Sequence, residues 1–177
     1  YNERVPAKLL SLKSDSREGV KVVTEPNAAV YQILGGFTCG HQFSLIRKCV
    51  FDHYKFQDSF RNESADQVCI ARTLLNGYKF GYVESARGDY FIHTTNSSAA
   101  AKGGTWKKNL EIRESSISGL KIFLYTEPCN RTIRLAVRKR LASELYWDIG
   151  YNIYLKNGDY SSALKYFAKG LTLDPSD

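Results

Sequence analysis

The sequence predicts a mixed α/β fold followed by a helical C-terminal part. Three observations carry this prediction: a short β-branched run, an apolar helix with clear start and stop signals, and a continuous helical pattern after about residue 125. The chain has 177 residues, of which 43% are hydrophobic and 24% charged, which is typical of a globular protein with a packed core. We expect an α/β part over residues 1–125 and a helical part over residues 126–177.

The elements of the α/β part follow from local signals. Residues 20–26 are rich in valine and end in proline, which predicts a short strand, and residues 27–34 predict a short helix that begins at Asn27. Residues 43–54 predict a strand, or a strand that leads into a short helix. The clearest helix lies within residues 61–77, with Ser64 at its start and Asn76-Gly77 at its end. Residues 78–85 alternate in the manner of a strand.

The C-terminal part predicts two helical segments. Residues 131–158 form one long helix or two helices joined by a bend, and residues 159–175 form another that ends at Pro175. The pattern resembles a single tetratricopeptide repeat, although the spacing from Gly150 to Gly158 is one residue longer than usual. It is carried by these residues: Trp147, Tyr154, Gly158, Asp159, Tyr160, Ala163, Phe167, Gly170 and Pro175. One repeat cannot cover its own apolar face, so it packs on the α/β part or further repeats follow residue 177. Trp147, Tyr154 and Phe167 are expected to be buried between the helices.

Charge and cysteine usage narrow the class of partner. The net charge of +7 suits phosphate-bearing partners such as nucleotides, phospholipids or nucleic acid. No nucleic-acid-binding motif is recognisable, so we expect no nucleic acid partner. The four cysteines contain no C-x-x-C pair, which disfavours zinc and favours buried thiols in a reducing compartment. We therefore expect a cytoplasmic protein, with a peripheral membrane contact as an option.

That option rests on a basic run without acids, from Arg131 to Arg140. It contains Arg131, Arg134, Arg138, Lys139 and Arg140, interleaved with aliphatic residues. Such a stretch can lie on an anionic membrane surface, or it can be a solvated face whose apolar side packs on the protein. The second interpretation is the commoner one, and it places all five basic side chains in solvent.

A series of motifs surrounds Asp66. Three glycines, Gly35, Gly36 and Gly40, precede the segment LIRK at residues 45–48. The helix with Asp66 and Arg72 follows, and a closing segment then supplies Tyr90, His93, Asn96 and Ser97. This order resembles the acceptor-binding half of family-2-type glycosyltransferases, which have the GT-A fold. The resemblance covers residues 30–100, and it departs from the family at Ala65, where the family usually has the glutamate of a Glu-Asp pair.

The resemblance implies a partial GT-A-like mixed sheet with helices and an inverting sugar transfer in which Asp66 is the general base. It implies Arg47, Arg72, Gly40 and His41 as substrate or phosphate contacts and His93 as a metal ligand. The divalent metal, Mn²⁺ or Mg²⁺, would be held mainly by a nucleotide-binding half that we expect to precede Tyr1. The substrates would be a nucleotide-sugar donor and a glycan or lipid-linked acceptor, as in cell-surface polysaccharide synthesis.

Each of these roles has an alternative. In the alternative interpretation, Asp66 only stabilises the positively charged start of its helix, where an acid contributes about 0.3–1 kcal/mol. The alternative for His93 and His41 is that they are ordinary histidines, and the alternative for Arg47 is an ion pair with Asp52. For the whole chain, the alternative is a non-enzymatic interaction module that uses the C-terminal helical repeat.

Overall fold

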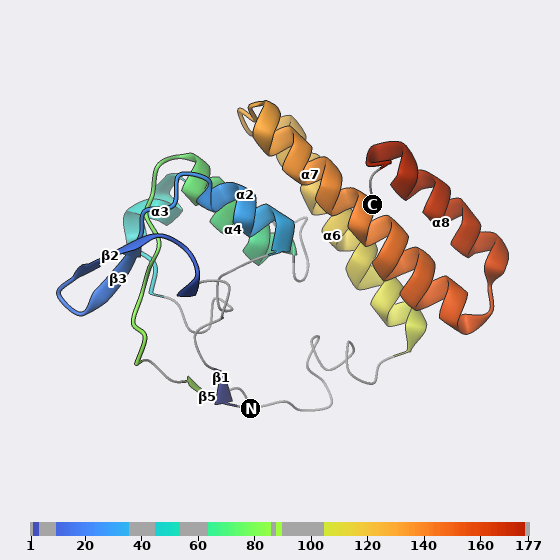
Figure 1. Cartoon of the computed structure of the whole chain (residues 1–177), viewed down its shortest axis with the longest axis horizontal. Helices are drawn as coiled ribbons and strands as arrows, with labels where there is room; N and C mark the ends of the chain where they lie inside the picture. The colour runs from blue at the N-terminus through green and yellow to red at the C-terminus, as the bar shows by residue number, and fades with distance from the viewer. Residues whose placement is uncertain are drawn as a thin grey trace.

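A computed structural model of the chain describes residues 2–3, 10–35, 45–53, 64–85, 88–89 and 105–175. The fold is mixed α/β and mostly helical, with a small antiparallel sheet at one side (Figure 1). The strands are β1 (Asn2–Glu3), β2 (Ser14–Arg17), β3 (Val20–Val23), β4 (Gly81–Tyr82) and β5 (Gly88–Asp89). The helices are α2 (Ala28–Gly35), α3 (Lys48–His53), α4 (Ser64–Leu75), α6 (Trp106–Thr126), α7 (Arg131–Ser143), η3 (Glu144–Tyr154), η4 (Leu155–Asn157) and α8 (Tyr160–Leu173).

The three-stranded sheet has the order β2-β3-β4, and both pairings are antiparallel. Strands β2 and β3 form a hairpin whose two turn residues, Glu18 and Gly19, both have positive φ, which matches the right-handed twist of the strands. Strand β4 joins the sheet from much later in the chain, with Tyr82 opposite Lys21. The predicted strand at residues 20–26 is therefore confirmed over Val20–Val23.

Helix α4 confirms the clearest prediction of the sequence. It begins at Ser64 and ends before Gly77, whose φ of +82° stops the helix. The Asn76 side chain donates to the Arg72 carbonyl at 2.8 Å, which satisfies one of the last carbonyls of the helix. The short helix expected after residue 27 is confirmed as α2.

Helix α6 had no counterpart in the sequence analysis. It runs from Trp106 to Thr126, and its start is capped by Thr105, whose hydroxyl accepts from the Lys108 amide. Its buried positions recur at helical spacing: Ile112, Ser116, Ile117, Gly119, Leu120 and Phe123. Because serine and glycine occupy two of these positions, the apolar periodicity in the sequence is weak.

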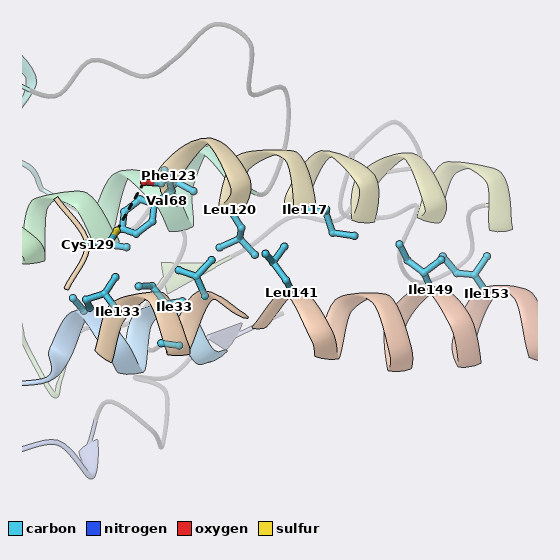
Figure 2. Close-up of a cluster of buried hydrophobic side chains, with 14 residues drawn as sticks. Ile33, Val68, Ile117, Leu120, Phe123, Cys129, Ile133, Leu141, Ile149 and Ile153 are labelled. Carbon is cyan, nitrogen blue, oxygen red and sulfur yellow. Dashed lines mark hydrogen bonds between the residues drawn. The ribbon is translucent and has the colours of Figure 1, made fainter. Parts of the chain in front are cut away.

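One hydrophobic cluster joins the early and late helices (Figure 2). Ile33 of α2 and Val68 of α4 lie in it with Phe123 of α6, Ile133 of α7 and Ile149 of η3. Phe123 is only 1% exposed and Ile149 is fully buried. A second, smaller cluster holds Leu12, Val23, Ala28 and Tyr82, two of which belong to the sheet. The larger cluster therefore contains residues from both sides of residue 125.

The predicted long helix over residues 131–158 is continuous, but its middle is widened. Helix α7 passes directly into η3, a π-helical stretch, and then into the 3₁₀ turn η4 (Figure 1). The Leu155 amide donates to the carbonyls of both Gly150 and Tyr151. A π turn accommodates one extra residue in a helix. It therefore offers a physical place for the residue that lengthens the spacing from Gly150 to Gly158.

Helix α8 packs antiparallel to η3 through two glycines. A Cβ atom on Gly150 would lie 2.8 Å from two ring carbons of Phe167, and one on Gly170 would lie 3.0 Å from the Cβ of Tyr146. The rings of Tyr146 and Phe167 are 4.5 Å apart. The expectation that Trp147 is buried is wrong, since it is 45% exposed. Its neighbour Tyr146 takes the position that faces α8, and adjacent helical residues point in different directions.

Replacing Gly150 by alanine should therefore lower the free energy of unfolding by about 1–2 kcal/mol, because the added methyl group overpacks the contact with Phe167. In an open helix the same change would stabilise the protein by about 1 kcal/mol. Chemical denaturation of the single variants and of the double variant with Phe167→Leu measures the coupling. A smaller cost of Gly150→Ala in the Phe167→Leu background is expected, and a stabilising single variant would contradict the close approach.

Candidate functional site

Asp66 is the third residue of α4 and lies in the first turn of that helix. Its side chain is half-buried, whereas Val68 and Ala71 on the same helix are buried in the main core. The start of a helix carries a partial positive charge, which stabilises a carboxylate there. The structure therefore holds an acidic group on a rigid element, at the boundary between the core and solvent.

Cys69 follows one turn after Asp66. It is a buried free thiol, and burial raises its pKa, an effect that Arg72 opposes and Asp66 reinforces. A thiol with a raised pKa stays protonated near neutral pH, and the thiolate is the nucleophilic form. Cys69 thus lies beside Asp66 as a buried thiol whose environment favours the protonated form.

Arg72, in the last turn of α4, has a structural partner. Its Nε lies 2.6 Å from Oε1 of Glu127, and only about a tenth of either side chain is exposed. Glu127 directly follows α6, so the ion pair ties α4 to the connection between α6 and α7. The role of Arg72 in substrate binding stays a prediction, because the structure shows only its contact with protein.

Of the remaining predicted site residues, only Arg47 lies in the part of the chain that the structure describes. Arg47 is exposed immediately before α3, where its carbonyl accepts from the Val50 amide. Gly40, His41 and His93 lie outside the described residues. Within residues 2–3, 10–35, 45–53, 64–85, 88–89 and 105–175, no three His, Cys, Asp or Glu side chains group as metal ligands.

A pocket of about 340 Å³ lies at the opposite end of α4 from Asp66. It is bounded by the β3–α2 connection, the end of α4 and the start of α7, with Thr24, Asn27, Tyr78 and Asn130 among its polar lining residues. Leu74, which also lines it, is eight residues from Asp66, or about 12 Å along the helix axis. The pocket and the predicted catalytic carboxylate are therefore separate features.

A buried charge cluster that sequence reasoning missed connects α6 to α7 and η3. Glu144 is fully buried, and its carboxylate binds Arg140 at 2.5 Å and Arg113 at 3.3 Å. Arg113 also lies 3.5 Å from Asp148. The only local signal was the spacing of four residues between Arg140 and Glu144, which places them on one helix face. Arg113 is 31 residues away from Glu144, so it carried no such signal.

The cluster corrects the expectation that all five basic residues of Arg131–Arg140 face solvent. Arg131, Arg134, Arg138 and Lys139 are exposed, but only 18% of the Arg140 side chain is. Arg140 is turned inward because it lies beside Glu144, and it also donates to the Leu34 carbonyl at 3.4 Å. It joins α7 to both η3 and α2.

The expectation of buried thiols is confirmed at Cys69 and Cys129 and is wrong at Cys49, which is exposed, while Cys39 lies outside the described residues. Burial also raises the pKa of the Cys129 thiol, and the positive charge of Arg134 partly offsets this increase. Cys49 is the second residue of α3, and its neighbour Val50 takes the buried position of that helix.

Comparison of the chain with protein-family models, curated proteins and solved structures finds no match. None of the helices within the described part of the chain is both long and apolar enough to cross a bilayer.

Proposed function

We propose that this chain is the acceptor-side part of an inverting nucleotide-sugar glycosyltransferase and that Asp66 is its general base. The observation that carries the proposal is the position of Asp66, in the first turn of a helix whose other face is packed in the core. A base must be held within hydrogen-bond reach of the hydroxyl that it deprotonates, and a rigid helix start does this better than a loop.

In the proposed reaction, the Asp66 carboxylate takes the proton of an acceptor hydroxyl. The acceptor oxygen then forms a bond to the anomeric carbon of the donor sugar. The bond from that carbon to the phosphate oxygen breaks, and the nucleoside diphosphate leaves with the bonding electron pair. Attack from the face opposite the leaving group inverts the anomeric configuration. The charge that develops on the leaving group requires basic side chains, for which exposed Arg47 is a candidate.

The resemblance in motif order also supports a partial GT-A-like fold for the α/β part. No three His, Cys, Asp or Glu side chains among the described residues group as metal ligands, and His93 lies outside those residues. His93 remains the proposed ligand from this chain, and Gly40, His41 and Arg72 remain proposed contacts with substrate.

Nucleoside diphosphate release tests this function. The full product of the gene is incubated with uridine-, guanosine- and thymidine-diphosphate sugars, with simple sugars and lipid-linked saccharides as acceptors. We expect release from one donor class that increases when an acceptor is added. Absence of acceptor-dependent release with every donor would reject the proposal.

A non-enzymatic interaction module is the second candidate, and one observation favours it. Large hydrophobic side chains are exposed on η3 and α8: Trp147, Tyr151, Tyr160, Leu164 and Leu171. Trp147 contacts both Tyr146 and Tyr151, and Tyr146 contacts Phe167, so the exposed residues of η3 connect to α8. Exposed apolar groups of this kind mark interaction surfaces. This candidate predicts no transfer in the release assay.

A further inference from the structure

Helix α7 presents a cationic stripe to solvent. Its exposed residues include Arg131, Arg134, Leu135, Arg138 and Lys139, which follow the i, i+3, i+4, i+7, i+8 spacing of a single helix face. The stripe is about 12 Å long, given the rise of 1.5 Å per residue. No acidic residue lies between Arg131 and Ser143, so no acid of α7 itself neutralises the stripe.

The basic side chains at the start of α7 lie where positive charge destabilises a helix. Arg131 and Arg134 belong to the first turn of α7 and its immediate continuation, where the helix already carries a partial positive charge. Cations at that end destabilise a helix, and this helix has no acid in its first turn to compensate. The positive potentials of the side chains and of the helix end therefore add at one surface, and this favours an anionic partner.

The opposite side of α7 is not available to a partner. Ile133, Ala136, Val137 and Leu141 are at most 4% exposed and lie in the main core. Helix α7 therefore cannot embed an apolar face in a bilayer, as a free amphipathic helix does. Any contact that it makes must be through the cationic stripe alone.

Two of the arginines are held in place by backbone carbonyls. Arg134 donates from Nε to the Cys129 carbonyl at 3.0 Å, and Arg138 donates from Nη2 to the Leu173 carbonyl at 3.1 Å. A guanidinium has five N–H donors, so each arginine keeps donors for an external anion. Arg134 and Arg138 remain exposed even though each donates a hydrogen bond to a backbone carbonyl.

We propose that the cationic stripe of Arg131, Arg134, Arg138 and Lys139 docks the protein electrostatically on an anionic phospholipid surface. The exposed face of α7 carries no aromatic ring on which nucleic acid bases would stack, whereas it does carry Leu135, which is 48% exposed. The lack of a stacking ring on α7 and the exposed Leu135 favour lipid over nucleic acid.

The variant that tests the proposal removes two charges for which the described part of the chain shows no bonded partner. Arg131 and Lys139 make no hydrogen bond or ion pair with any described residue, so Arg131→Ser/Lys139→Ser should fold normally. The matched control, Lys107→Ser/Lys156→Ser, also removes two positive charges, but from the start of α6 and from η4, far from the start of α7. Figure 1 shows the start of α6 near the turn between η4 and α8, and the contact of Trp106 with Tyr154 places Lys107 there.

Co-sedimentation measures partitioning of the full protein onto phosphatidylcholine vesicles with about 30 mol% phosphatidylserine. We expect binding at about 0.1 M salt and its loss at about 1 M salt, where the screening length falls to about 3 Å. The stripe variant should bind about 25-fold more weakly, at about fivefold per basic residue, while the control changes little. Absence of binding by the unmutated protein, or an equal loss in the control, would overturn the proposal. So would binding of a DNA or RNA oligonucleotide, sensitive to the stripe variant, without vesicle binding.

Discussion

Replacing Asp66 by asparagine should lower the rate of sugar transfer about 100- to 10,000-fold, because the proposed general base is removed while its shape is kept. Asparagine retains the size and much of the hydrogen-bonding capacity of aspartate, but it cannot accept a proton from a hydroxyl. The change also removes a negative charge from the start of α4, which should cost only about 0.3–1 kcal/mol of stability. Activity and stability are thus expected to separate.

The measurement combines initial rates of nucleoside diphosphate release with thermal unfolding of the same preparations. Asp52→Asn is the matched control, since Asp52 is an exposed acid on helix α3. We expect the control to retain the unmutated rate. An Asp66→Asn protein that unfolds earlier but transfers sugar at the normal rate would show that Asp66 only stabilises its helix.

Replacing Arg140 by methionine should destabilise the fold by about 3 kcal/mol, because it leaves the fully buried Glu144 with Arg113 as its remaining close cation. Removal of one partner from a buried ion pair costs far more than the pair itself contributes. Lys139→Met is the matched control on the same helix, and as a surface change it should stay within about 0.5 kcal/mol. Glu144→Leu in the Arg140→Met background should recover much of the loss.

The effect of Arg140→Met should also depend on pH. Burial raises the pKa of Glu144 above its ordinary value of 4.5, and Arg140 and Arg113 oppose that shift. A raised folded-state pKa gives stability that is fully present below the unfolded-state pKa and is lost as pH rises through the folded-state value. The unmutated protein should therefore gain stability relative to Glu144→Gln as the pH falls from neutrality toward 4.5.

The penalty of Arg140→Met should shrink over the same range, because a protonated Glu144 needs no cation. Urea unfolding of both proteins across this pH range measures the loss of unfolding free energy caused by Arg140→Met. A loss that stays constant with pH would contradict the role of the Glu144 carboxylate as the group that Arg140 neutralises.

Several elements could be predicted because their signals are local. Helix α4 has its start at Ser64 and its stop at Gly77 within a single run of sequence, and both lie where predicted. The predictions of strand β3 and of the late helices also needed only adjacent residues. Strand β2 was missed because its hairpin turn is Glu18-Gly19, which lacks the usual Asn-Gly or Asp-Gly signal.

The candidate site could be predicted only in part. The position of Asp66 at a helix start follows from sequence, since the cap and the apolar periodicity are both local. The partner of Arg72 could not be predicted, because Glu127 is 55 residues away and is brought near only when α4 packs beside α6. The resemblance to a glycosyltransferase concerns motif order, and its assignments for Gly40, His41 and His93 stay predictions.

The sequence by itself determined which segments are helical after residue 130 and where α4 begins and ends, because capping residues and apolar spacing act over a few residues. Only the tertiary structure decided which side chains those helices bury. Arg140 turns inward because Glu144 and Arg113 meet it there, and Trp147 stays exposed because Tyr146 takes the place against α8. Such choices depend on which surfaces approach one another across long separations in the chain, and helical periodicity does not encode that approach.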